Sequence, residues 1–137
     1  MKLKSFALII LIITALLVGC GKNTGLEDTE WVLESYGLQS NLKAVLPATE
    51  VTATFDSING QVSGSGGCNG YGGRYELSGN RLSIPEPLIH TEMSCGEDRD
   101  QQEREFFMAL QSAESYLIVE KSLTINCGDK ILVFRQK

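Results

Sequence analysis

The segment Gly64-Ser65-Gly66-Gly67-Cys68-Asn69-Gly70-Tyr71-Gly72-Gly73 decides how this chain folds, because glycine fills six of its ten positions. The segment lacks the spacing of a phosphate-binding loop, and the residues after it are strand-like rather than helical. Glycines at this density permit bulges and close backbone approach where strands bend to close a barrel. A second interpretation is a binding loop around Gly67, Asn69 and Tyr71, in which backbone amides form a nest for an anion.

Hairpin signals stand on both sides of this segment. They are Ile58-Asn59-Gly60-Gln61 before it and Leu77-Ser78-Gly79-Asn80-Arg81-Leu82 after it. They predict a meander in which strands near residues 50 to 66 and 72 to 84 pair antiparallel. Trp31–Tyr36 and Val51–Phe55 alternate apolar and polar residues, which predicts two half-buried strands.

The rest of the chain predicts one helix and a few more strands. Prolines at 85 and 87 leave a short or edge strand at Leu88 to Met93. The helix follows Cys95, is expected to be capped by Asp98 or Asp100, and runs through Ala113. Its apolar face holds Phe106, Phe107 and Leu110, and the closing strands are Tyr116 to Val119, Leu123 to Cys127 and Ile131 to Phe134. The fold class predicted is mainly β (α+β), an antiparallel, partly closed β-barrel of eight or nine short strands with one amphipathic helix.

The N-terminus predicts export and lipid anchoring. Two lysines precede an apolar run from Phe6 to Val18, which fits a secretory signal and is shorter than the roughly 20 residues of a membrane-spanning helix. Leu17-Val18-Gly19-Cys20 resembles a bacterial lipobox, which implies cleavage before Cys20 and its acylation. We therefore expect a signal peptide at 1–19, a tether at 20–28 and a domain at 29–137. No Asp follows Cys20, so we expect the outer membrane where the cell has two.

Composition narrows the function classes. The chain of 137 residues carries 12 Lys and Arg against 17 Asp and Glu, a net charge of −5. Loss of Lys2 and Lys4 with the signal peptide leaves −7 on 118 residues, which argues for a single domain and against a nucleic-acid partner.

Three cysteines remain once Cys20 is assigned to lipid. An exported protein keeps disulfides, and three thiols allow three single pairings. Cys127 ends a strand-like run on its apolar side, so we expect it to be a buried core residue. Cys68 and Cys95 lie in loops flanked by glycine or serine, and we expect these two to pair.

A further set of residues is spread along the chain: Trp31, Gly67-Cys68-Asn69, Tyr75, Thr91-Glu92-Met93-Ser94-Cys95, the helix residues Glu103, Phe106 and Leu110, and Leu132-Val133-Phe134. This set, which covers about residues 28 to 135, resembles the META domain family, which includes the HslJ-like lipoproteins. It implies a small antiparallel β fold with one helix, found in envelope and secreted proteins. It also implies a disulfide between Cys68 and Cys95 and no established catalytic activity.

Residues for catalysis or metal binding are sparse. His90 is the only histidine, which excludes a site of several imidazoles, and the expected disulfide removes two of three candidate thiolates. The acidic residues Glu97, Asp98, Asp100, Glu103 and Glu105 lack calcium-loop spacing and are expected to be a solvated helix start. The tyrosines at 36, 71, 75 and 116 suit either a binding mouth or core packing. No catalytic residue, metal or cofactor is expected.

The sequence therefore predicts a monomeric, non-catalytic envelope lipoprotein. Its partners are expected to be the membrane, through the lipid anchor, and an unknown envelope protein or a lipid-like ligand. Two alternatives stay open. One is a hydrolase-like envelope enzyme using His90 or the Asn69 loop, and the other is a purely structural, stress-induced spacer.

Overall fold

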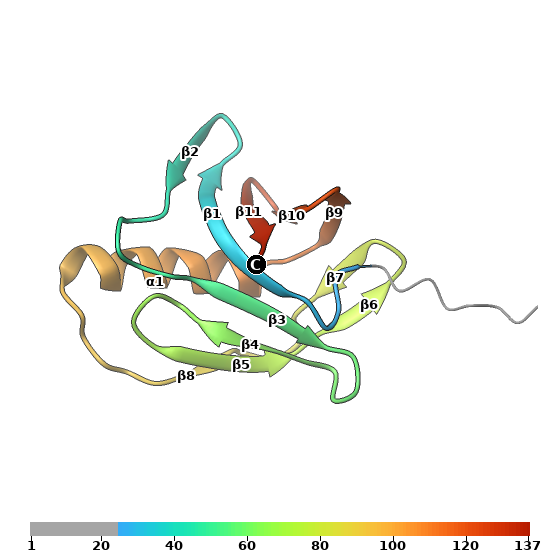
Figure 1. The fold of residues 1–137 in the computed structure, drawn as a ribbon. Helices are drawn as coiled ribbons and strands as arrows, with labels where there is room; N and C mark the ends of the chain where they lie inside the picture. Colours follow the sequence, from blue (N-terminus) through green and yellow to red (C-terminus); the bar gives the residue numbers. More distant parts are fainter. Residues whose placement is uncertain (1–24) are drawn as a thin grey trace, which may run out of the picture.

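The computed structural model describes residues 25–137, which form one antiparallel sheet and one helix (Figure 1). The elements are β1 (Glu30–Leu38), β2 (Asn41–Ala44), β3 (Thr52–Asp56), β4 (Gln61–Ser65), β5 (Gly70–Arg74), β6 (Glu76–Ser78), β7 (Arg81–Ser83), β8 (Ile89–His90), α1 (Glu97–Gln111), β9 (Ser115–Val119), β10 (Ser122–Cys127) and β11 (Lys130–Gln136). The expected signal peptide and the lipidated Cys20 lie outside the described residues.

The sheet forms an open half-barrel. Its strand order is β6-β7-β9-β10-β11-β1-β3-β4-β5-β8, with β2 paired to β1 beside this path. Within residues 25–137 the edge strands β6 and β8 do not pair with each other, so the barrel stays open. The predicted fold class, a mainly β, partly closed antiparallel barrel with one helix, is confirmed. The described sheet has 11 strands where eight or nine were expected.

The core lies between α1 and the central strands. The helix packs against β1, β10 and β11, and its apolar face is buried as predicted. Phe106 is fully buried, and its ring centroid lies 6.4 Å from that of Phe134 on β11. The side chains of Trp31 and Phe55 are also buried. Apolar residues from both halves of the chain therefore share one core.

The predicted meander is wrong beyond β5. Strands β3, β4 and β5 do pair in sequence, but β5 then pairs with β8 rather than with β6. The chain crosses at Tyr75, which is buried against the Phe55 ring, and the hairpin β6–β7 joins the opposite edge beside β9. Tyr75 thus lies between two hairpins that pair at opposite edges of the sheet, although local turn signals predict that they are continuous.

The predicted helix cap is also wrong. Gly96 precedes the helix with a positive φ of 101°, and no side chain caps the first turn. The carboxylate of Asp100 instead accepts hydrogen bonds from the backbone N–H of Cys95, at 2.8 Å, and from the hydroxyl of Ser94, at 2.6 Å. These two bonds lower the pKa of Asp100 and fix the loop that enters the helix. The helix ends at Gln111, before Ala113.

One glycine of the central segment is required by close packing of backbones. A Cβ at Gly64 on β4 would lie 2.1 Å from the carbonyl oxygen of Thr52 on β3. A real Cβ does not approach so closely, so any larger residue would push β3 and β4 apart. Gly64 therefore permits the close backbone approach that the first interpretation of the segment predicts.

The domain begins earlier than residue 29. Leu26 is fully buried, and its carbonyl oxygen accepts a hydrogen bond from the indole of Trp31 at 2.9 Å. The side chain of Asp28 accepts hydrogen bonds from the backbone and hydroxyl of Ser57. The last residues of the expected tether therefore belong to the folded domain.

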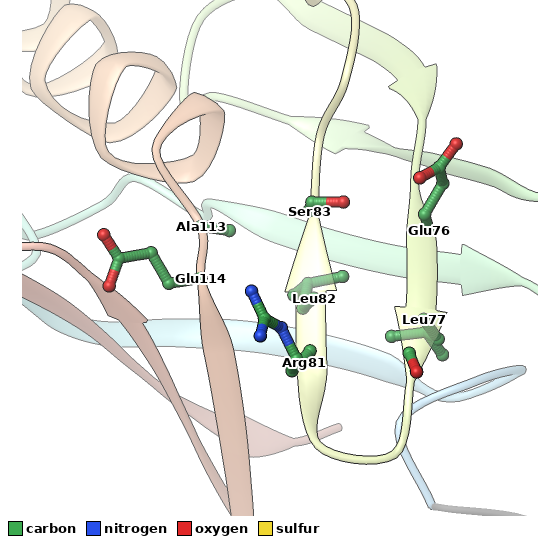
Figure 2. A pocket seen from close by; sticks show the side chains of 8 residues that line it. Glu76, Leu77, Arg81, Leu82, Ser83, Ala113 and Glu114 are labelled. Carbon is green, nitrogen blue, oxygen red and sulfur yellow. The ribbon is translucent and has the colours of Figure 1, made fainter.

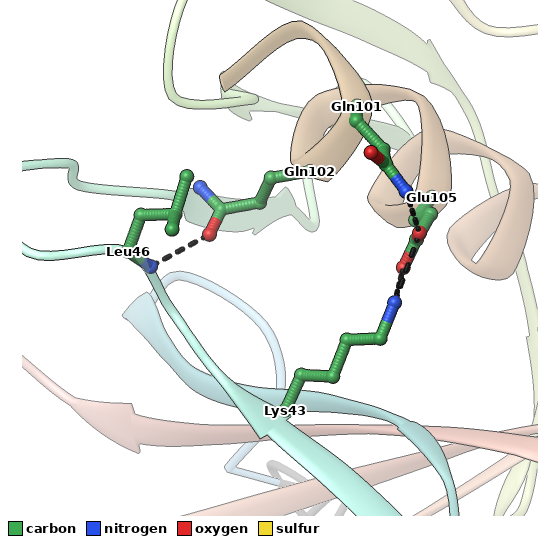
Figure 3. A network of polar contacts seen from close by, with 5 residues as sticks. All are labelled: Lys43, Leu46, Gln101, Gln102 and Glu105. Carbon is green, nitrogen blue, oxygen red and sulfur yellow. Dashed lines mark hydrogen bonds and ion pairs between the residues drawn. The ribbon is translucent and has the colours of Figure 1, made fainter. Parts of the chain in front are cut away.

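Polar contacts fasten the helix to the connection between β2 and β3 (Figure 3). Lys43 on β2 forms an ion pair with Glu105, at 2.9 Å, and this contact lowers the pKa of the carboxyl group. The buried side chain of Gln102 accepts a hydrogen bond from the backbone N–H of Leu46 at 2.7 Å and donates one to Thr49. The first turns of α1 are therefore held from one side by residues 43–49.

Candidate functional site

A disulfide joins the glycine-rich segment to the loop before α1. Cys68 and Cys95 are bonded, with their Cα atoms 5.9 Å apart. This is the pairing predicted from the sequence. Cys127 is free and buried, also as predicted, and burial raises the pKa of its thiol to about 12.

The carboxylate of Glu103 on α1 lies buried beneath the same segment. It accepts hydrogen bonds from the backbone N–H groups of Cys68, at 3.0 Å, and Asn69, at 2.6 Å. The side-chain amide of Asn69 donates a third bond to it. Three N–H donors converge on this carboxylate, so the nest predicted around Gly67 and Asn69 is occupied by an anion of the protein itself.

Asn69 also holds the chain that runs from β8 to the helix. Its side-chain oxygen accepts hydrogen bonds from the Met93 backbone N–H and the Thr91 hydroxyl, both at 2.8 Å. Its side-chain nitrogen donates to the Met93 carbonyl oxygen at 3.0 Å. A buried amide thus pairs with the Met93 backbone as a neighbouring strand would, and fixes residues 91–93 in place.

A groove of about 420 Å³ lies between residues 90–94 and α1. We call it the helix groove. Its apolar lining comes from Met93, Phe107 and Met108, of which Met93 and Met108 are 61% and 65% exposed. Its buried end is formed by Asn69 and Glu103, whose polar atoms are already bonded within the protein. The groove therefore combines exposed apolar side chains with charged residues at its sides and a hydrogen-bonded polar end.

His90 stands at the rim of this groove. Its ring stacks on Phe107, with centroids 4.8 Å apart and planes 23° from parallel. Its Nδ1 atom lies 2.9 Å from the carbonyl oxygen of Thr91. Cys95, which the sequence places five residues away, is held in the disulfide and offers no thiol to this ring.

The three residues of the expected binding loop take different positions. Gly67 adopts a positive φ of 106° at the turn, and Asn69 lines the helix groove. The Tyr71 ring instead packs edge-on against Phe106 and Phe107 in the core, and its hydroxyl donates to the Thr52 carbonyl oxygen at 2.8 Å. The other three tyrosines are buried as well, so the tyrosines belong to the core rather than to a binding mouth.

A second hollow, of about 520 Å³, lies beside the β6–β7 hairpin (Figure 2). Glu76, Arg81 and Glu114 line it together with two leucines, two serines and Ala113. Figure 2 shows the Arg81 side chain extending from β7 toward the segment that holds Glu114. This hollow lacks large exposed apolar residues, and we regard the helix groove as the candidate site.

Within residues 25–137 no three His, Cys, Asp or Glu side chains are grouped so that they could hold a metal ion. No helix in that part of the chain is long and apolar enough to cross a membrane.

Sequence reasoning missed the role of Glu103, which it assigned to a solvated helix start. Glu103 is only 6% exposed, and it lies three and seven residues before Phe106 and Leu110. Helical periodicity puts all three on one face, so a carboxylate in line with the apolar residues was the signal for a buried acceptor.

Comparison with known proteins gives consistent results. A family model described as META domain matches residues 24–137. An NMR structure of a protein from Burkholderia xenovorans is 26% identical, with 82% of this chain and 83% of that chain covered and a TM-score of 0.70. A second NMR structure is 22% identical, with coverages of 81% and 91% and a TM-score of 0.63.

A more distant similarity concerns the fold alone. The crystal structure of a DUF4847 family protein from Bacteroides vulgatus ATCC 8482 is 14% identical, with coverages of 80% and 93% and a TM-score of 0.57. A search of curated proteins finds no match.

Proposed function

The chain belongs to the META domain family, and on that premise we propose that it is an envelope lipoprotein whose domain is a non-catalytic binding module. Acylated Cys20 would supply the anchor, and the helix groove would bind an apolar segment of another envelope protein.

The lipobox-like sequence supports the anchor. Cys20 precedes Leu26, the first buried residue within 25–137, by six positions. A fully extended chain spans at most about 3.5 Å per residue, so the lipid would lie at most about 20 Å from the domain. A module held this close to a bilayer suits a partner at the same surface.

The helix groove carries the binding proposal. Large exposed apolar side chains grouped in a groove mark a binding surface more often than scattered ones do. Met93 and Met108 supply long flexible side chains, which adapt to varied apolar partners. The groove is open to solvent rather than enclosed, which favours a protein segment over a buried acyl chain.

The polar groups near the groove support a non-catalytic module. The amide of Asn69 and the carboxylate of Glu103 are committed to hydrogen bonds with the backbone and with each other. His90 packs on Phe107, and its Nδ1 atom contacts the backbone of Thr91. The hydrogen bond of the His90 ring thus goes to a backbone carbonyl, and not to a nucleophile among the residues that line the groove.

Site-specific photocrosslinking tests the proposal. A photoreactive amino acid at position 108 is compared with one at Leu117, a residue on β9 with a similar exposure of 61%. We expect position 108 to capture a defined envelope protein and position 117 to capture none. Met93→Glu should abolish that product, whereas Val119→Glu, at another exposed site on β9, should leave it. Equal labelling from both positions, or labelling of lipid alone, would contradict the proposal.

A further inference from the structure

Both methionines of the described chain and its only histidine line one groove. Met93 lies on the segment after β8, Met108 on α1, and His90 at the end of β8. The two methionine side chains are largely exposed. Most of the surface of each methionine is therefore open to solution.

His90 is oriented as a metal ligand would be. The carbonyl oxygen of Thr91 can only accept a hydrogen bond, so Nδ1 carries the proton in their 2.9 Å contact. In the neutral ring, Nε2 then offers its lone pair. A metal-binding histidine commonly donates its other ring N–H to a carbonyl in this way, and stacking on Phe107 fixes the ring further.

The charges around the groove favour a cation. The carboxylates of Glu92, Asp100 and Glu103 line it, against a single cationic side chain that always carries its charge, Arg104. The pKa of Asp100 is lowered by its hydrogen bonds, so that carboxylate is ionised at neutral pH. The groove therefore carries an excess of negative charge.

We propose that Met93, Met108 and His90 bind one soft monovalent cation, Cu(I) or Ag(I), in the helix groove. Thioether sulfur is a soft ligand that selects Cu(I) over hard ions, and imidazole suits copper. All three side chains line the same groove, and the two methionine side chains are exposed and flexible, so they can adjust their positions around a bound ion. The argument against a zinc site rests on the scarcity of imidazoles and thiolates. It does not exclude a site whose main ligands are thioethers. The inference does not rest on the protein partner proposed above.

Silver titration of the full chain in detergent tests the site, because Ag(I) needs no reductant. Free thiols also bind silver, so the parent protein carries Cys20→Ala and Cys127→Ala and retains the Cys68–Cys95 disulfide. We expect one Ag(I) per chain by native mass spectrometry and calorimetry, with shifts of the Met93 and Met108 methyl signals in NMR spectra. Zn(II), a harder ion, should bind at least tenfold more weakly.

Variants separate ligation from apolar packing. Met93→Leu and Met108→Leu keep the size and apolarity of the groove but remove sulfur, and each should weaken Ag(I) binding about tenfold or more. Arg104→Met, one helical turn before Met108, removes the opposing charge and adds a thioether, and should tighten it. Leu42→Met, an exposed position on β2, should leave the Ag(I) affinity unchanged.

Absence of stoichiometric silver binding, or equal Ag(I) affinity in the leucine variants, would overturn the proposal. If position 108 captured no envelope protein while the chain still bound silver, only the proposed protein partner would be refuted.

Discussion

At the scale of single residues, one hydrogen-bonded pair organises the candidate site. Glu103 accepts three hydrogen bonds from N–H groups of Cys68 and Asn69, and the side chain of Asn69 is hydrogen-bonded to the backbone of Met93. The helix, the glycine-rich segment and the groove wall therefore meet at two side chains. Because both are buried, any substitution that leaves one of these donors without a partner is costly.

Glu103→Gln tests the importance of this buried carboxylate. The amide nitrogen of Gln would face N–H donors, so we expect a loss of about 2 to 3 kcal/mol in the free energy of unfolding, measured in urea. Glu105→Gln on the same helix is the matched control. Its partner Lys43 is exposed, so the loss there should stay below about 1 kcal/mol. Equal losses in the two variants would rule out a special role for Glu103.

Cys127 should be inert in the native protein. Burial raises its pKa to about 12, so at pH 8 only about one thiol in ten thousand is ionised, and the thiolate is the reactive form. Peptide mass spectrometry after iodoacetamide treatment should find Cys127 unmodified in the native state and modified in urea. Modification of the native protein at the rate of a free cysteine would show that the thiol is accessible.

The sequence predicted single residues well where one rule applied. Cys127 ended an alternating run and is buried, and Cys68 with Cys95 stood in loops and are bonded. It failed for Glu103, because acidic residues near a helix start are usually solvated. Only the approach of a loop 35 residues earlier in the chain makes its burial favourable.

At the scale of elements, the disulfide and the glycines set how the segment from β4 to α1 packs. The bond closes a separation of 27 residues that contains β5, both strands of the β6–β7 hairpin, and β8. The chain crosses from one sheet edge to the other within this loop, so the disulfide restricts its least regular part.

Reduction should lower the free energy of unfolding by about 3.5 kcal/mol, the chain-entropy value for a loop of this size. Urea unfolding with and without a phosphine reductant measures the difference. The double variant Cys68→Ala/Cys95→Ala should lose a similar amount and should no longer respond to the reductant. An unchanged unfolding midpoint on reduction would mean that the bond does not contribute to stability.

Gly64→Ala should destabilise the protein by more than about 2 kcal/mol, since its Cβ would meet the Thr52 carbonyl oxygen at 2.1 Å. Gly70→Ala on β5 is the control, because its Cβ would have no neighbour closer than 3.8 Å. That variant should keep the parent stability within about 1 kcal/mol. Thermal unfolding of the two variants measures the contrast, and similar unfolding temperatures would contradict close packing of β3 against β4.

Hairpins and the helix could be predicted from local signals, whereas strand order could not. The Asn59-Gly60 turn and the hairpin around Gly79 appear where expected. At the crossing, Tyr75 packs against Phe55, a long-range contact that no turn signal predicts. The helix start was misplaced for a similar reason, because Asp100 bonds backward to the disulfide loop instead of capping its own helix.

At the scale of the whole molecule, the protein is a META domain half-barrel that we propose is held near a bilayer by lipid on Cys20. The groove beside α1 belongs to the same rigid unit as the disulfide, because Asn69 lines the groove and neighbours Cys68. A lipid anchor and a disulfide are expected together in an exported protein. Acylation at a lipobox and a persistent disulfide both require passage out of the cytoplasm.

Intact-mass analysis of the protein extracted from membranes tests this central claim most directly. We predict the mass of a chain that begins at Cys20 and carries acyl groups. Reduction should add two hydrogens, and before reduction a single thiol should be alkylated in denaturant. A full-length, unacylated chain of 137 residues in the cytosol, with all four of its cysteines open to alkylation without reduction, would contradict it.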